Sequence, residues 1–134
     1  MDQLNTPVLL ITDDDRDDRE FLTEALTQTG FPGVIRVFEN GEELMNHLTS
    51  SPRLNAELIV LDLNMPLKNG YETLKELKQH SILKDITVVI LTSSSRLQDE
   101  KYCYDLGCKY FLKKPLNYSG YVDVAKEIIS LTNG

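Results

Sequence analysis

The residues LIVLD at positions 58–62 carry the clearest structural signal in this sequence. Four consecutive apolar residues are typical of a strand that is buried on both faces of a parallel sheet. The run ends in Asp62, so a carboxylate stands at the carboxyl end of the predicted strand. Ligands of open parallel sheets bind at those ends, which makes Asp62 the first candidate functional residue.

Short apolar runs and amphipathic helices alternate on both sides of this stretch. Strands are predicted at residues 7–12, 34–38, 58–61, 86–91 and 109–112. Helices are predicted at about residues 17–29, from Asn40 to Ser50, after Asn69, from the serines at 93–95 to Leu106, and at residues 118–131. Five strands alternating with five helices indicate an α/β fold, in which a parallel sheet carries helices on both faces and the crossovers are right-handed.

Local residues predict where individual helices begin or end. Asn40 is followed three residues later by Glu43, which is the pattern of a capping box. The serines at 93–95 can cap the fourth helix, and Gly107 is a natural stop at the end of that helix.

Length and charge limit the function. The 134 residues fit one domain, so we expect a single domain over residues 1–134 without an output domain. The net charge is −7 and no basic patch is visible, which argues against binding to nucleic acid or to an anionic membrane. No apolar run could cross a bilayer, and the first residues lack the pattern of a secretory signal, so we expect a cytoplasmic protein.

Cys103 and Cys108 match no metal-binding spacing, and we expect reduced thiols, with Cys108 in the core.

Polar residues recur where the predicted strands end. Asp13 and Asp14 follow the first strand, Asp62 the third, Thr92 the fourth and Lys114 the fifth. With the strand order 2-1-3-4-5, the first and third strands are neighbours at the point where the order reverses. The three aspartates would then converge in one pocket.

Three carboxylates in one pocket repel one another, and keeping them ionised requires a cation. An all-oxygen site with few protein ligands suits Mg²⁺, which also binds phosphate oxygens. One carboxylate could then act as a nucleophile toward phosphorus, while the hydroxyl of Thr92 and the ammonium of Lys114 bind the phosphoryl oxygens. The spacing therefore favours a phosphoryl-transfer site.

Simpler interpretations apply to single residues. Asp15, Asp17 and Asp18 fit the cap and first turn of a helix, where aspartate is favoured, and we interpret them in this way. Asp14 suits a helix cap and a metal site equally well. Each of the other polar residues could be an ordinary residue at a strand end, and only their combination at four strand ends indicates a site.

Four stretches resemble the motifs of receiver domains of two-component response regulators. Residues 8–15 (VLLITDDD) look like the family's apolar strand and acidic pair. Residues 58–66 (LIVLDLNMP), followed by Asn69-Gly70, look like the phosphoacceptor signature. Residues 88–93 (VVILTS) resemble the switch strand, and residues 106–115 (LGCKYFLKKP) resemble the lysine segment. The resemblance covers nearly the whole chain, in the family's order and spacing.

This resemblance implies a flavodoxin-like fold and a phosphorylation pocket. Asp62 would be the phosphoacceptor. Asp13 and Asp14 would form the acidic part of a Mg²⁺ site, with Asp14 as the more direct ligand. Asp62 and the backbone carbonyl of Asn64 would complete the protein ligands.

The resemblance also implies a switch around the phosphoryl group. Thr92 would bond the phosphoryl group, and Lys114 would pair with Asp62 or its phosphate. Phe111, in place of the family's frequent tyrosine, would be the aromatic side chain that rotates. The side chains of Asn64 and Ser94 would tune the lifetime of the phosphorylated form.

Partners follow from the same resemblance. The chain looks most like stand-alone regulators of the chemotaxis and phytochrome-associated kinds, which are signalling proteins rather than enzymes. A histidine kinase or phosphotransfer protein would supply the phosphoryl group and dock beside the first helix, where exposed residues such as Asp17 and Asp18 could steer it. An unknown downstream protein would bind the face of the fourth helix, fifth strand and fifth helix. Its candidate contacts are four tyrosines, each with a position partly in the core as the alternative: Tyr102, Tyr104, Tyr118 and Tyr121. Homodimerisation through that face is left open.

Three other functions remain to be weighed on this fold. A metal-dependent phosphatase would carry a second aspartate two residues after its nucleophile, where this chain has Asn64. A flavin carrier would need a loop rich in Ser, Thr and Gly after the first strand, and the loop here is acidic. A receiver that binds partners without phosphorylation would have lost pocket residues that are present here.

Overall fold

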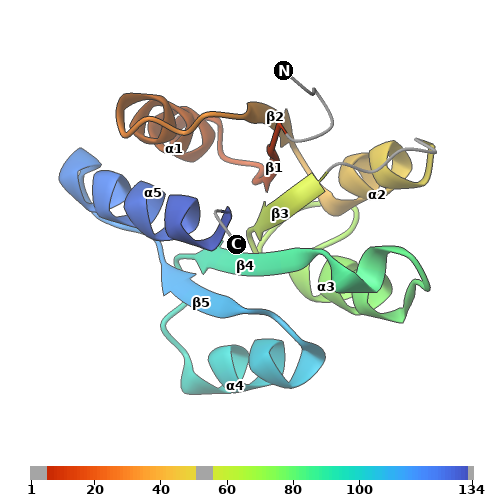
Figure 1. Cartoon of the computed structure of the whole chain (residues 1–134). Helices are drawn as coiled ribbons and strands as arrows, with labels where there is room; N and C mark the ends of the chain where they lie inside the picture. Colours follow the sequence, from red (N-terminus) through yellow and green to blue (C-terminus); the bar gives the residue numbers. More distant parts are fainter. Residues whose placement is uncertain (1–5, 51–55, 133–134) are drawn as a thin grey trace.

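Five parallel strands form one sheet in the order β2-β1-β3-β4-β5, as predicted (Figure 1). The computed structural model describes residues 6–50 and 56–132. The strands are β1 (Val8–Thr12), β2 (Val34–Phe38), β3 (Ala56–Leu61), β4 (Thr87–Thr92) and β5 (Tyr110–Lys113). This is the flavodoxin-like arrangement, in which β1 and β3 are neighbours at the point where the strand order reverses.

Helices cover both faces of the sheet (Figure 1). One layer consists of α1 (Arg16–Gln28) and α5 (Tyr118–Thr132). The other consists of α2 (Gly41–Ser50), α3 (Gly70–Gln79) and α4 (Leu97–Leu106). A short 3₁₀ helix, η2 (Leu83–Asp85), precedes β4.

Successive residues of the central strands pack into opposite layers. In β3, Leu58 and Val60 contact the α1–α5 layer, whereas Ile59 and Leu61 contact the layer of α2, α3 and α4. Because side chains alternate along a strand, a strand that is covered on both faces needs apolar residues at every position. This is why residues 58–61 read as an unbroken apolar run.

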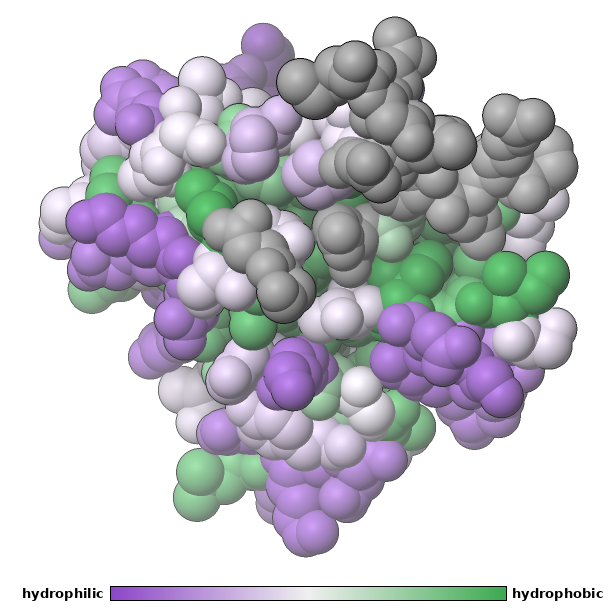
Figure 2. All heavy atoms as spheres, viewed as in Figure 1, coloured by the Kyte–Doolittle hydropathy of each residue, from purple (hydrophilic) through white to green (hydrophobic). Residues whose placement is uncertain are grey.

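The surface agrees with the charged composition of the chain. In the view of Figure 2, hydrophilic side chains gather over the outer sides of the helices, and hydrophobic side chains appear in patches between them. The edge strand β2 is less covered than the central strands, and Val34 and Val37 are exposed. Among the residues that the structure describes, no helix has the length and apolar character needed to span a membrane.

Asn40 caps α2 in the way that the sequence predicts, but the second half of the predicted capping box is wrong. The Asn40 side chain accepts a hydrogen bond from the N–H of Glu43 at 2.9 Å. The Glu43 carboxylate accepts from the N–H of Glu39 at 3.2 Å instead of from Asn40. A complete capping box lies at the start of α3, between Asn69 and Glu72, where the sequence analysis did not predict one.

The predicted serine cap of α4 is wrong. The helix begins at Leu97 after Arg96, and Arg96 makes no side-chain capping bond. Ser94 donates a hydrogen bond to the carboxylate of Asp99, and this contact occupies its hydroxyl. At the other end of α4, Gly107 is the predicted stop, with a φ of 109° that favours glycine.

Gly70 lets α3 begin directly against the backbone that follows β3. Its N–H donates to the carbonyl oxygen of Leu63 at 3.0 Å. A Cβ atom on Gly70 would lie only 2.2 Å from the carbonyl oxygen of Asp62. This close approach fixes the main chain at Asp62.

We expect Gly70→Ala to lower the free energy of unfolding by about 3 kcal/mol or more, because backbone atoms would have to move to admit the methyl group. Urea denaturation measures the change. The control is Gly30→Ala, where no atom lies within 4 Å of the added Cβ. That control should cost only about 1–2 kcal/mol for the left-handed backbone. Equal costs for the two variants would contradict the close approach at Gly70.

Both cysteines are free thiols, and Cys108 lies in the core, as predicted; Cys103 is buried there too. Burial raises the pKa of Cys103 to about 12 and the pKa of Cys108 to about 11. Because the thiolate is the reactive form, the native protein should react slowly with iodoacetamide at pH 8. The reaction should accelerate as the pH rises toward 11, and labelling in guanidinium chloride should be fast at pH 8. Native labelling at the unfolded rate would show that these thiols are not in the core.

Candidate functional site

The turn from β1 into α1 places two of the predicted acidic residues. The N–H of Asp13 donates to the carbonyl oxygen of Phe38 at 3.1 Å, which continues the β1–β2 pairing. Its carboxylate accepts from the N–H of Asp15 at 2.9 Å and is buried. Asp15 caps α1 by accepting from the N–H of Asp18 at 3.1 Å, as predicted for Asp15. Asp13 is therefore held rigidly, while Asp14 is exposed at the rim.

Asp62 reaches the same place from β3. Its N–H donates to the carbonyl oxygen of Thr12 at 3.0 Å, and its side chain is buried. Asp13, Asp14 and Asp62 each bring a carboxylate oxygen to within 4.8 Å of the others. The predicted convergence of the three aspartates is confirmed.

Lys114 extends from the end of β5 into this acidic cluster. Its N–H donates to the carbonyl oxygen of Thr92 at 2.8 Å, which fixes the start of the side chain beside β4. Its ammonium nitrogen lies 2.9 Å from Oδ2 of Asp13 and 3.2 Å from Oδ2 of Asp62. A third contact, at 2.8 Å, joins it to Oδ2 of Asp18.

The charges in this cluster do not balance. Burial, together with the nearby charge of Asp62, raises the pKa of Asp13 to about 7, although a hydrogen bond from Lys114 acts in the opposite direction. Burial alone would lower the pKa of Lys114, but hydrogen bonds to Asp18 and Asp13 overcome it, so the pKa is raised and the ammonium stays charged. The Lys114 ammonium contacts three acidic side chains, and the exposed Asp14 adds a fourth beside Asp13 and Asp62.

The donor set fits a divalent cation. Oδ1 of Asp62 is buried and has no hydrogen-bond partner within the described part of the chain. A buried carboxylate oxygen without a donor is costly unless a cation or a bound group satisfies it. Closely spaced carboxylate oxygens are the ligands that Mg²⁺ prefers.

The other predicted site residues surround the cluster without bonding to it. Thr92 is fully buried at the end of β4, and its hydroxyl oxygen accepts from the N–H of Ser94 at 3.4 Å. Phe111 is half-buried in β5, and Asn64 is exposed in the loop after β3. Among the described residues, no hydrogen bond joins the side chains of Thr92, Asn64 or Ser94 to the carboxylates of the acidic cluster.

The contact of Asp18 with Lys114 was not predicted from the sequence, and Tyr121 takes the core position that was one of its two predicted alternatives. Asp18 lies in the first turn of α1, as predicted. It is half-buried and bonded to Lys114, so its prediction as an exposed steering charge is wrong. The hydroxyl of Tyr121 donates to Oδ1 of Asp18 at 2.9 Å. Tyr121 is buried, so it is not available as a surface contact. A signal was present, because Asp18 precedes the buried Leu22 and Ala25 by four and seven residues and therefore lies on the inner stripe of α1.

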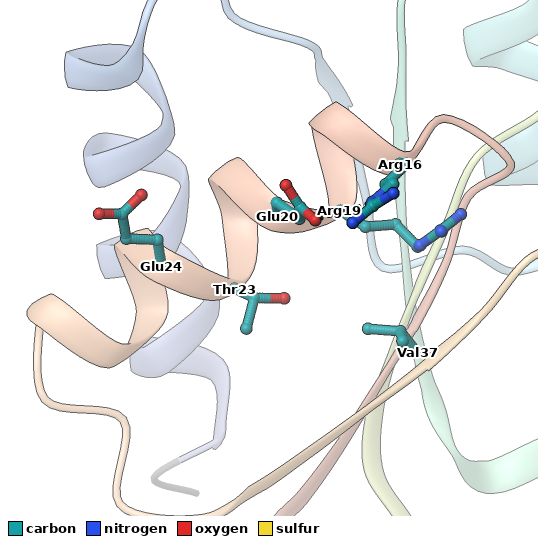
Figure 3. A pocket seen from close by; sticks show the side chains of 6 residues that line it. All are labelled: Arg16, Arg19, Glu20, Thr23, Glu24 and Val37. Atoms are coloured by element: carbon teal, nitrogen blue, oxygen red, sulfur yellow. Dashed lines mark hydrogen bonds and ion pairs between the residues drawn. The ribbon is translucent and has the colours of Figure 1, made fainter.

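A separate hollow lies between α1 and β2 (Figure 3). It has a volume of about 500 Å³, and its lining residues are Arg16, Arg19, Glu20, Thr23, Glu24 and Val37. Arg19 connects it to the acidic cluster, because its guanidinium donates to the carbonyl oxygen of Asp13 at 2.6 Å. None of the cluster's carboxylates lines this hollow.

The sequence matches a known family over most of its length. The model of the response regulator receiver domain matches residues 9–125. Response regulator Rcp1 from Synechocystis sp. is 36% identical over 123 residues, which cover 87% of this chain and 82% of that protein. The probable transcriptional regulator ycf29 from Pyropia yezoensis is 31% identical over 122 residues, which cover 91% of this chain but only 53% of that protein.

Solved structures agree with this match. The phosphorylated cyanobacterial phytochrome response regulator RcpA has a TM-score of 0.88 at 29% identity, over 96% of this chain and 95% of that chain. The Mn²⁺-bound form of Rcp1 has a TM-score of 0.82 at 32% identity, over 92% of this chain and 91% of that chain. The match to RcpA agrees with the predicted resemblance to phytochrome-associated regulators. The chain therefore belongs to the response regulator receiver domain family of two-component signalling.

Proposed function

We propose that this protein is a phosphorylation switch in which Asp62 accepts a phosphoryl group from the phosphohistidine of a histidine kinase or a phosphotransfer protein. The observation that carries the proposal is the meeting of three aspartates and Lys114 at the ends of β1, β3 and β5. Asp62 is the member of the cluster with a buried oxygen that lacks a partner. The phosphorylated state of the relative RcpA supports the proposal by similarity.

Asp13, Asp14, Asp62 and the backbone carbonyl of Asn64 would hold a Mg²⁺ ion. Bound there, Mg²⁺ would supply positive charge that neutralises the carboxylates and the phosphoryl oxygens. The fixed side chain of Asp13 and the partnerless oxygen of Asp62 support this assignment. The Mn²⁺-bound form of Rcp1 supports a divalent ion at a receiver of this kind.

In the transfer step, a carboxylate oxygen of Asp62 attacks phosphorus. The new O–P bond makes an acyl phosphate, and the P–N bond to the donor histidine breaks with its electron pair going to nitrogen. The ammonium of Lys114, already 3.2 Å from Asp62, binds a phosphoryl oxygen. Such positioning and charge neutralisation are most of what phosphoryl transfer requires from a protein.

Thr92 and Phe111 would carry the signal away from the phosphoryl group. Within the described residues, the hydroxyl of Thr92 has one hydrogen bond, a long one of 3.4 Å from the N–H of Ser94, so a phosphoryl oxygen could draw it away at little cost. Movement of Thr92 would open space for the half-buried ring of Phe111. The two arrangements form a two-state equilibrium, which the phosphoryl contacts shift.

Ser94 and Asn64 would set how long the acyl phosphate lasts. Asn64 is exposed at the rim of the pocket, where its side chain could limit the approach of water. The hydroxyl of Ser94 is held by Asp99 in the unphosphorylated chain, which turns it toward α4. Release of this contact would couple the phosphoryl lifetime to the position of α4.

The face formed by α4, β5 and α5 would bind the downstream protein. It presents exposed apolar and aromatic side chains, namely Leu97, Tyr102, Tyr104 and Tyr110. The hydroxyl of Tyr104 accepts from the N–H of Phe111 at 3.0 Å, so this face is bonded directly to the proposed switch residue. A second copy of this chain is an alternative occupant of the same face.

We expect acetyl phosphate with Mg²⁺ to add one phosphoryl group to the wild-type chain, as read by intact mass. The product should be absent from Asp62→Asn and absent when EDTA is present. Asp105→Asn is the matched control, because it removes an exposed carboxylate of α4 and should be phosphorylated normally. A phosphoryl group that persists in Asp62→Asn would place the chemistry on another residue.

An assay of phosphate-ester hydrolysis by the same purified protein distinguishes a phosphorylation switch from a phosphatase. A switch should release little p-nitrophenol from p-nitrophenyl phosphate, because Asn64 stands where a phosphatase would carry its general acid. Steady release over many turnovers would favour the phosphatase.

We expect Asp13→Asn to weaken Mg²⁺ binding by at least about tenfold, since even changes behind a metal ligand have effects of that size. Isothermal titration calorimetry measures the affinity. Asp17→Asn removes the same charge from an exposed position on α1 and should change the affinity by less than about twofold. If both variants lose the same Mg²⁺ affinity, binding would depend only on the overall charge of the protein.

A further inference from the structure

The Lys114 ammonium is in contact with three carboxylates. The three contacts are to Asp18 at 2.8 Å, to Asp13 at 2.9 Å and to Asp62 at 3.2 Å. Asp18 makes the shortest of them, yet it lies on α1 and is not one of the residues assigned to the metal. An arriving phosphoryl group therefore has to share a lysine that is already fully engaged.

The carboxylate of Asp18 is itself held from its other side. Its Oδ1 accepts from the hydroxyl of Tyr121 at 2.9 Å, while Oδ2 accepts from Lys114. The ring of Tyr121 is buried and lies 5.7 Å from the ring of Phe21, between α1 and α5, which run side by side (Figure 1). Burial, reinforced by the bond to Asp18, raises the pKa of Tyr121, so the hydroxyl remains a donor.

The lengths of the three contacts indicate which one a phosphoryl oxygen would replace. The contact to Asp62 is the longest, and it lies where the phosphoryl group would form. The contacts to Asp18 and Asp13 can persist while the third proton turns to the new oxygen. A lysine side chain has four rotatable bonds, and without such contacts its ammonium would lose its fixed position.

We propose that Asp18 and Tyr121 are positioning residues, which hold the ammonium of Lys114 at the place where it meets the phosphoryl group. The inference deepens the proposed function and rests on it. In this role Asp18 contributes to the phosphorylation site by holding Lys114 in place, and not by binding the metal. It also ties the phosphorylation site to the packing of α1 against α5.

The test compares phosphorylation rates at saturating Mg²⁺ and acetyl phosphate, read by intact mass, in Tyr121→Phe and Asp18→Asn. We expect both variants to be slower by about fivefold or more, the effect of losing one hydrogen bond to a charged group. The Mg²⁺ affinity of Tyr121→Phe should stay within about twofold of wild type, because this change removes no charge and Tyr121 is not a proposed ligand. Asp18→Asn also removes a charge beside the metal site, so its Mg²⁺ affinity should fall, and Tyr121→Phe is the variant that separates rate from affinity. Loss of rate without loss of metal affinity distinguishes positioning from general damage to the pocket.

Tyr118→Phe is the matched control. Tyr118 lies on the same helix, and its hydroxyl donates to Oε1 of Gln28 on α1 at 2.9 Å, away from the acidic cluster. It should be phosphorylated at the wild-type rate. If Tyr121→Phe is as fast as Tyr118→Phe, the inference is wrong. If Asp18→Asn fails to fold, the rate of Tyr121→Phe still tests the inference, because this change removes a single oxygen atom from the side chain.

A second readout needs no phosphorylation. In ¹⁵N-lysine NMR spectra, the Lys114 ammonium should give a slowly exchanging signal in wild type and in Tyr118→Phe, and the signal should broaden or vanish in Tyr121→Phe. An unchanged signal in Tyr121→Phe would overturn the positioning role. If wild type is not phosphorylated but the Lys114 signal behaves as expected, the proposed function fails while the tether to Asp18 stands.

Discussion

Negative charge concentrated at the carboxyl end of the sheet is the constraint on which this structure depends. Asp13, Asp14 and Asp62 meet within 4.8 Å, and Asp18 adds a fourth carboxylate beside them. Among the described residues, the ammonium of Lys114 is the one that forms ion pairs with them. Such a cluster is stable only while counter-charge is near, so it is prepared for a cation and sensitive to any group that changes its charge.

The fold supplies this arrangement through ordinary packing. Strands buried on both faces end together at one edge, and the order β2-β1-β3 brings the acidic turn after β1 beside Asp62. Backbone hydrogen bonds fix each end: Asp13 to β2, Asp62 to Thr12 and Lys114 to Thr92. These backbone bonds do not fix the flexible side chain of Lys114, which is held by its contacts with the carboxylates.

Most of the fold and the centre of the site could be predicted from the sequence. The apolar run at 58–61 identified the central strand, and polar residues at strand ends identified Asp13, Asp14, Asp62 and Lys114 as neighbours. The contacts of Asp18 could not be predicted, because they depend on how α5 packs against α1, which brings Tyr121 from 103 residues away. The serine cap of α4 failed because the Ser94 hydroxyl donates to the carboxylate of Asp99 and accepts from the N–H of Arg96, which precedes the helix, rather than from an N–H of the first turn.

The most direct test of this account is a crystal structure of the protein soaked with Mn²⁺ and measured for anomalous scattering. A single strong peak is expected within about 2.5 Å of carboxylate oxygens of Asp62 and of the Asp13–Asp14 pair. Lys114 should remain in contact with Asp18. A cluster without any anomalous peak at saturating Mn²⁺, or a peak only among other carboxylates, would contradict the claim that these aspartates share one cation.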